Sequence, residues 1–338
     1  MDFLTGGSKN TWQPVMGIDT TTSSYWLNWR MLLCCVWILT AMGIASYLIT
    51  KYEGRSKRKS RNNENDDDDY GGVLYDDEVW MPCLKGIHPA WLMTYRILAF
   101  VVLLILITLN AIVDGGAIFY YYTQWTFTLI TIYFGLGSLL SIYGCYKYYN
   151  KFGGDRNEEL DEEQAEISNL PNAAKYTGRK ELKHPRQVAG FLGYVFQIMF
   201  QMQAGAIVLT DCVFWFIMVP FLTIKDYNLN FLIINMHSIN AVFLIGDTAL
   251  NSLRFPWFRI AYFVLWTCAF VVFQWTVHAC IALWWPYPFL DISSPFSPLW
   301  YLLVAMLHVP CYGIFVLVIK LKHFLLSTWF PNSNRYVL

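Results

Sequence analysis

A histidine stands inside a hydrophobic segment, residues 231–250, that is long enough to cross a membrane. The segment contains His237 within the run NMHSINAVFLIGDTALN. An ionisable side chain in hydrocarbon costs a few kcal/mol, so a histidine there usually has a partner or a chemical task. At about 100° per residue, one face of a continuous helix holds His237 with four other polar residues: Asn240, Asp247, Thr248 and Asn251. We expect this face to meet protein or water rather than lipid.

Two threonines on another apolar segment are candidate nucleophiles for this histidine. Thr123 and Thr126 lie in the run FYYYTQWTF. If the third span starts just after the Asp114-Gly115-Gly116 turn, Thr123 is six residues inside the outer end of that span. His237 is seven residues inside the outer end of its own span, counted from Asn230. Both therefore lie at a depth of about 10 Å below the same boundary. A neutral imidazole is the usual base for a hydroxyl nucleophile. The structural alternative is a threonine that bonds a carbonyl of its own helix.

Other polar side chains are candidates for orienting the imidazole or for stabilising an oxyanion. Asp211 or Asn240 is the better candidate for the orienting role, because Asp247 is about 15 Å along the helix from His237. Gln124, Gln201 and Asn240 are the candidate oxyanion donors. Glutamines can also simply join helices, at about 0.6 kcal/mol each. His278 and His308 also lie in apolar segments, where a single histidine is more often a hydrogen-bonded packing residue.

The composition is that of a membrane protein. Apolar residues make up 56% of the chain, aromatic residues 18% and charged residues only 14%, whereas soluble domains are about a quarter charged. A membrane-spanning helix needs roughly 20 mainly apolar residues. Seven segments meet this requirement: 29–49, 91–113, about 117–146, about 189–222, 231–250, 260–283 and 299–319. We therefore expect an all-α, polytopic transmembrane helix bundle.

The placement of Lys and Arg predicts how the bundle is oriented. With seven spans, most Lys and Arg fall on one side, mainly in the charged loops 51–90 and 148–188. Cytosolic loops carry such an excess. We expect the tail 1–28 to be outside or lumenal and the tail 323–338 to be cytosolic. The membrane itself, of the endoplasmic reticulum or the cell surface, is not specified by these features.

Several other functions have no support in the sequence. There is no GxSxG, HExxH or Walker motif and no paired-cysteine metal spacing. We therefore expect no cofactor and no metal ion. The basic run after the first segment follows from topology and does not indicate a nucleic acid as partner. The expected partners are membrane lipid and a lipid substrate, while protein partners are unspecified.

Four motifs, in order between residues 120 and 291, resemble the androgen-induced, FAR-17a-like membrane proteins. These are YYTQWTFTLITIYF, NMHSINAVFLIGD, RFPWFR and WWPYPFLD. The first also resembles the Leu-Thr-x-Trp motif of the related rolling stone proteins. The first two spans and both charged loops exceed the compact core of that family. YWLNWR at the first span looks more like a plant-type branch.

The resemblance implies a hydrolase of fatty acid esters of hydroxy fatty acids, with an intramembrane threonine and a histidine. By these motifs, the threonine of the family corresponds to Thr123 and its histidine to His237. Thr126 also precedes a Phe, so the threonine could instead correspond to Thr126, one turn further along. The expected function is thus hydrolysis of a long-chain lipid ester. The alternatives are a transporter, channel or scaffold and a seven-span receptor; inverted repeats or broken helices would favour transport.

Overall fold

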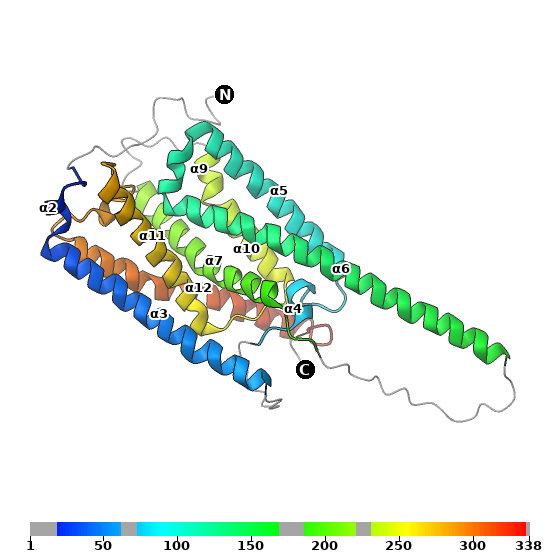
Figure 1. Cartoon of the computed structure of the whole chain (residues 1–338). Coiled ribbons are helices and arrows are strands. Elements are labelled where there is room, and N and C mark those ends of the chain that lie inside the picture. Colours follow the sequence, from blue (N-terminus) through cyan, green and yellow to red (C-terminus); the bar gives the residue numbers. More distant parts are fainter. Residues whose placement is uncertain (1–18, 62–72, 169–185, 221–230, 336–338) are drawn as a thin grey trace.

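The computed structural model describes residues 19–61, 73–168, 186–220 and 231–335. It is an α-helical bundle in which seven helical segments are long and apolar enough to cross a membrane (Figure 1). This confirms the predicted all-α, multi-pass architecture. The helices of the bundle are α3 (Trp29–Arg61), α5 (Pro89–Asp114), α6 (Tyr122–Ser168), α7 (Phe191–Val213), α9 (Phe231–Met236), α10 (Ile239–Leu250), α11 (Ile260–Cys280) and α12 (Ser297–Trp329).

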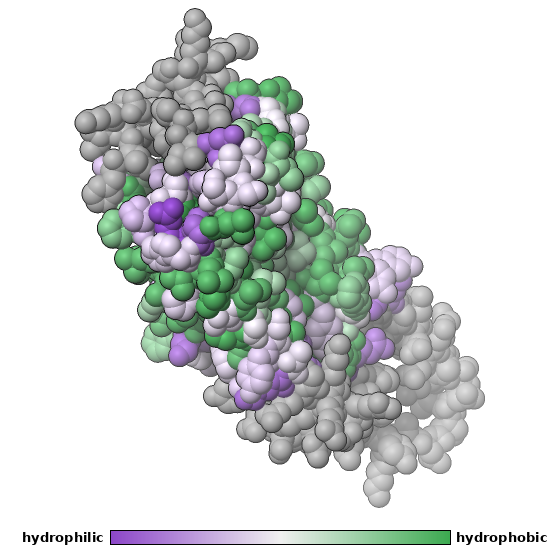
Figure 2. Space-filling view, turned by 60° about the vertical axis from the view of Figure 1, so that its left-hand side comes forward, coloured by the Kyte–Doolittle hydropathy of each residue, from purple (hydrophilic) through white to green (hydrophobic). Residues whose placement is uncertain are grey.

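The helices differ in how deeply they lie in the bundle. In the most apolar stretch of each helix, only 17% is buried for α3 and for α5, against 56% for α6 and 61% for α7. Helices α6 and α7 therefore form the centre of the bundle. Between them, the Tyr133 and Phe196 rings stack with centroids 4.5 Å apart. Outward-facing side chains such as Leu98 and Ile112 are exposed, and hydrophobic side chains cover much of the face in Figure 2. Such a surface is suited to lipid rather than water, and the chain is an integral multi-pass membrane protein.

One end of the bundle is closed by short helices, and we call it the Tyr287 end. It contains α2 (Ser23–Trp26), η1 (Gly116–Tyr120) and η4 (Pro288–Leu290). The Tyr25 hydroxyl donates to Asp291 at 2.7 Å and accepts from Trp285 Nε1 at 2.9 Å. Burial and the Asp291 carboxylate together raise the pKa of Tyr25. This network fixes α2 to the segment between α11 and α12.

The opposite end, which we call the Glu78 end, holds a packed helix within the charged loop 51–90. Helix α4 (Asp76–Trp80) buries Glu78, Val79 and Trp80. The Glu78 carboxylate lies 3.0 Å from Arg254 and 3.2 Å from Arg186. Burial raises the pKa of Glu78, although both arginines work against the rise. This part of the charged loop therefore belongs to the fold.

The fifth span is broken, contrary to the continuous helix expected for residues 231–250. Helix α9 ends at Met236, Ser238 has non-helical backbone angles (φ −138°, ψ −46°), and α10 begins at Ile239. A π-helical turn, η2 (Phe214–Met218), follows α7. Its Phe214 ring stacks on the His237 imidazole at 3.6 Å, and Trp215 Nε1 donates to the His237 carbonyl at 3.0 Å. These contacts hold the break, so His237 no longer shares one helix face with Asp247.

Candidate functional site

His237 lies at the break between α9 and α10 and faces a carboxylate from α7. Its Nδ1 is 3.6 Å from Asp211 Oδ1, and the residue is buried, with 7% of its surface exposed. Asn240, in the first turn of α10, also interacts with the Asp211 carboxylate. The structure thus brings together His237 and both residues that the sequence offered as its orienting partner.

Gln124 reaches the same break from α6. Its Nε2 donates to Met236 Sδ at 2.7 Å, and Asn110 Nδ2 from α5 donates to the same sulfur at 2.9 Å. The side-chain oxygens of both amides are buried without a hydrogen-bond partner. Gln124 is therefore next to the histidine-bearing segment, with its side-chain oxygen left without a partner.

The two predicted nucleophiles lie elsewhere on α6. Thr123 is half-buried and meets the Tyr287 hydroxyl. Burial raises the pKa of Tyr287, while the hydrogen bonds to Thr123 and the backbone of Tyr122 oppose that rise. Thr126 is fully buried and donates to the Tyr122 carbonyl at 3.1 Å, which is the structural alternative for this residue. Among the described residues, no hydrogen bond joins either threonine to His237, and that pair stays a prediction.

The remaining sequence candidates are distant from His237 and have structural partners. Gln201 Nε2 donates to the Arg254 carbonyl at 3.1 Å, as does Gln197 Nε2 at 3.0 Å. Both glutamines therefore join α7 to the segment that follows α10. Asp247 is fully buried and pairs with Arg96 Nε at 2.8 Å. Its other oxygen accepts from Tyr133 at 2.6 Å and from Asn251 at 2.8 Å.

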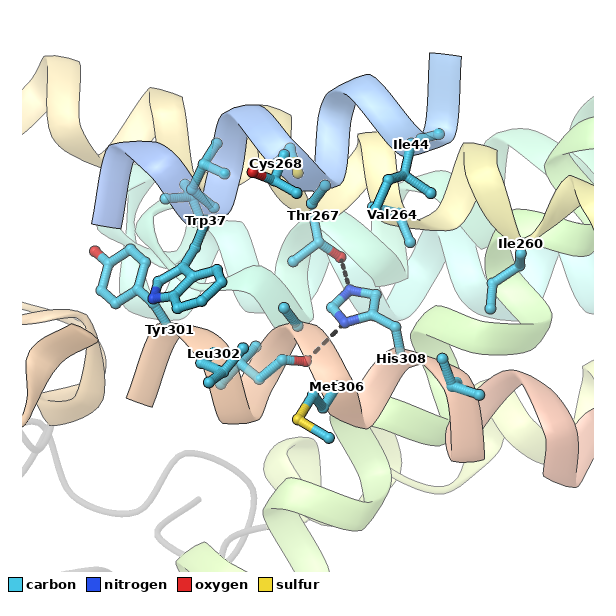
Figure 3. Close-up of a pocket in the computed structure, with 18 of the residues that line it drawn as sticks. Trp37, Ile44, Ile260, Val264, Thr267, Cys268, Tyr301, Leu302, Met306 and His308 are labelled. Carbon is cyan, nitrogen blue, oxygen red and sulfur yellow. Dashed lines mark hydrogen bonds between the residues drawn. The ribbon is translucent and has the colours of Figure 1, made fainter. Parts of the chain in front are cut away.

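A threonine and a histidine do form a hydrogen-bonded pair, but on α11 and α12. His308 Nε2 is 2.8 Å from Thr267 Oγ1, and His308 Nδ1 is 2.8 Å from the Val304 carbonyl (Figure 3). A carbonyl only accepts, so Nδ1 carries the proton in a neutral ring. Nε2 then presents its lone pair to the Thr267 hydroxyl, which also lies 3.3 Å from the Phe263 carbonyl of its own helix, a longer contact than the one to the imidazole. This is the arrangement that a general base needs in order to activate a threonine.

A tyrosine completes this pair. The Tyr122 hydroxyl is 2.8 Å from Thr267 Oγ1. When the threonine proton is directed to His308 or to the Phe263 carbonyl, the Tyr122 hydroxyl is the donor of the bond to the threonine oxygen. Both ring nitrogens of His278, by contrast, face backbone carbonyls, Gln274 at 2.8 Å and Trp284 at 3.3 Å. His278 is thus a packing residue, whereas His308 has a reactive partner.

Thr267 and His308 lie on the wall of a cavity of about 420 Å³ between α3, α11 and α12. Its other walls are mainly apolar and include Trp37, Ile44 and Leu302 (Figure 3). Helix α3 forms one wall and is among the least buried spans, which places the cavity at the periphery of the bundle. A fatty acyl chain fits such walls, and its polar end would meet the hydroxyl and imidazole.

Sequence reasoning treated His308 as a single histidine because its partner is 41 residues away on another span. Helix periodicity does not connect residues of different helices. The one available signal was that Thr267 and His308 both interrupt apolar spans. In the part of the chain that the structure describes, no three His, Cys, Asp or Glu side chains form a metal-binding group.

Comparisons of the chain with family models, with curated proteins and with solved structures find no match. The resemblance to the androgen-induced family stays a prediction from its four motifs.

Proposed function

We propose that this protein is an integral membrane hydrolase of long-chain lipid esters, with Thr267 as nucleophile and His308 as base. One observation carries the proposal. The Thr267 hydroxyl is 2.8 Å from the imidazole Nε2 on the wall of an apolar cavity of about 420 Å³. A nucleophile, its base and a space for the acyl chain therefore occur together.

The reaction would proceed through an acyl-threonine. Thr267 Oγ1 attacks the ester carbonyl carbon while its proton moves to His308 Nε2. The bond from the carbonyl carbon to the ester oxygen then breaks, and the imidazolium returns the proton to the leaving alkoxide. Water attacks the acyl-threonine in the second half, with His308 again accepting and returning a proton. The Val304 carbonyl holds the ring throughout, because it accepts from Nδ1.

The Tyr122 hydroxyl is the candidate oxyanion donor. It lies 2.8 Å from Thr267 Oγ1, and Tyr122 is buried in a cluster of mainly apolar side chains. A hydrogen bond in a dry site is stronger than in water. When the threonine oxygen becomes bonded to carbon, the tyrosine proton is available for the oxygen of the former carbonyl.

The substrate class follows from the walls of the cavity. Apolar lining from three helices supports a neutral ester with a long acyl chain that arrives through the bilayer. Fatty acid esters of hydroxy fatty acids are the class that the family resemblance implies. The distribution of Lys and Arg supports an outer or lumenal N-terminus and a cytosolic C-terminus. The host membrane would be the endoplasmic reticulum or the plasma membrane.

A transporter or channel is the second candidate function, and the broken fifth span favours it. Transporters often bind their substrates at interrupted helices. The break between α9 and α10 holds the His237–Asp211 pair. A transporter would keep its ligand binding or flux when the Thr267 hydroxyl is removed.

The test is release of fatty acid from a long-chain ester by the purified full-length protein in lipid nanodiscs. Thr267→Val and His308→Gln should each lower turnover by about 10²–10⁴-fold, because each removes a group of the proton-transfer step. Thr267→Ser should keep measurable turnover. Thr276→Val is the matched control, since this exposed threonine of the same helix bonds only its own helix carbonyl at 2.8 Å.

Two results would count against this assignment. If Thr123→Val or His237→Gln abolishes turnover and Thr267→Val does not, the centre is the pair expected from sequence. If folded wild-type protein releases no fatty acid from any long-chain ester tested, the hydrolase proposal is rejected. Folding of each variant is checked by its elution profile and unfolding midpoint.

A further inference from the structure

We infer that the break between α9 and α10 is a binding site for one monovalent cation, with Na⁺ as the ion to test. This inference does not depend on the proposed hydrolysis. An interrupted helix at membrane depth is tolerated where protein or a polar cavity satisfies the freed backbone groups. The break at His237–Ser238 faces the π-helical turn η2, and such turns are frequent at functional sites.

Four buried polar atoms near the break lack a hydrogen-bond partner within the described ranges. They are Asn110 Oδ1, Gln124 Oε1, Asp211 Oδ1 and His237 Nδ1. The exposed fractions of Asn110, Gln124 and His237 are only 1%, 3% and 7%. Native proteins leave few such atoms unsatisfied, and an ion, water or catalytic role usually explains them. Asp211 Oδ1 and His237 Nδ1 face each other at 3.6 Å, whereas the Asn110 and Gln124 oxygens have no partner of either kind. Two such oxygens beside this pair indicate that the site binds something.

The contacts place these atoms around two consecutive residues. The amide nitrogens of Asn110 and Gln124 both donate to Met236 Sδ, at 2.9 Å and 2.7 Å. Met236 precedes His237, whose Nδ1 lies 3.6 Å from Asp211 Oδ1. Helices α5, α6 and α7 thus each contribute an oxygen beside the break.

The free atoms select the class of ligand. Three of the four are oxygens of amides or a carboxylate, which are the ligands of hard cations. Asp211 is the one carboxylate that the described residues place beside the break, and no Lys or Arg of the described chain forms an ion pair with it. One positive charge balances it, whereas a divalent ion would leave a net charge in a low-dielectric interior. We therefore assign the site to a monovalent cation, with His237 neutral.

The experiment measures the unfolding midpoint of the purified full-length protein as NaCl replaces choline chloride at constant ionic strength. We expect a saturable rise, because a ligand that binds only the folded state stabilises it. Asp211→Asn should weaken the apparent Na⁺ affinity by about tenfold or more, since it removes the one charge of the site. Gln124→Leu and Asn110→Leu should weaken it by removing one ligand each. They test the site even if Asp211→Asn does not fold.

Gln201→Leu is the matched control, because Gln201 lies on the same helix as Asp211 but bonds the Arg254 carbonyl. It should keep the wild-type Na⁺ response. A midpoint that is the same in NaCl and in choline chloride would overturn the inference. So would a response to pH with none to Na⁺, which would make the ligand a proton, or an equal response in Asp211→Asn and wild type. Loss of the Na⁺ response leaves the hydrolase assay at Thr267 unaffected, so the two proposals fail separately.

Discussion

At the scale of single residues, the three membrane histidines differ in what their ring nitrogens face. His278 faces two carbonyls, His308 faces a carbonyl and a hydroxyl, and His237 faces a carboxylate. A carbonyl only accepts, so it fixes which ring nitrogen carries the proton. A hydroxyl can pass its proton to the free lone pair of the ring, and a carboxylate favours the charged form of the ring. Their residue type alone therefore does not assign a function, whereas their partners do.

Asp247 gives a prediction at the same scale. It forms a fully buried ion pair with Arg96 at 2.8 Å. Asp247→Asn should cost about 3–5 kcal/mol of stability, because it leaves the Arg96 charge buried without its counter-charge. Asp76→Asn is the control, since the Asp76–Lys147 pair is about one third exposed and should cost at most about 1 kcal/mol. Unfolding midpoints in detergent measure both, and equal losses would contradict the role given to Asp247.

The sequence predicted that polar residues would gather near His237 but not which ones. Asp211 and Asn240 were anticipated as orienting partners because Asp247 is about 15 Å along the helix from His237. Gln201 could not be distinguished from them as a neighbour of His237, because the angular position of a residue on its own helix does not show which other helix it contacts. Thr267 and His308 were not paired because their contact depends on how α11 and α12 cross. Such crossings are set by packing of side chains from both helices.

At the scale of elements, hydropathy was sufficient to locate the spans and insufficient to find the break in one of them. Pro310 lies inside α12 without ending it, whereas the α9–α10 break contains no proline. The break is held by the Phe214 ring and the Trp215 indole from η2. Because these are tertiary contacts, the periodicity of residues 231–250 carried no sign of them.

Close approach of α7 and α11 yields a second prediction. A methyl group added at Gly205 would overlap the Phe263 ring of α11. Gly205→Ala should therefore destabilise the protein by about 1–3 kcal/mol, as overpacked cores do.

Gly313→Ala on α12 is the control, because nothing lies within 4 Å of the added carbon. It should be neutral or stabilising by up to about 1 kcal/mol, since alanine favours helix over glycine. Unfolding midpoints of the two variants test the contact. A Gly205→Ala variant as stable as Gly313→Ala would mean that α7 and α11 are not packed this closely.

At the scale of the whole molecule, the bundle has two chemically different ends. The Glu78 end is rich in ion pairs among α4, α6 and the flanking segments, such as Lys147–Asp76 at 3.0 Å and Arg186–Asp77 at 2.8 Å. The Tyr287 end is built from aromatic rings, including His278 on Trp285 at 3.8 Å. Basic residues favour the cytosolic side and aromatic residues favour the interface.

This asymmetry predicts the orientation of the chain. An acceptor site for N-linked glycosylation placed in residues 1–28 should be modified in cells, and one placed in residues 323–338 should not. A mobility shift that glycosidase treatment reverses measures each. Modification at the C-terminal site alone would reverse the proposed topology and place the Glu78 end outside or in the lumen.

The central claim is that His308 activates Thr267 toward a lipid ester, and covalent labelling tests it most directly. The purified protein is treated with a fluorophosphonate that carries a long alkyl chain, and the modified residue is identified by mass spectrometry of its peptides. We expect one adduct on Thr267, with labelling lost in His308→Gln and retained in Thr276→Val. An adduct on Thr123 that requires His237, or no adduct on any threonine of the folded protein, would contradict the account.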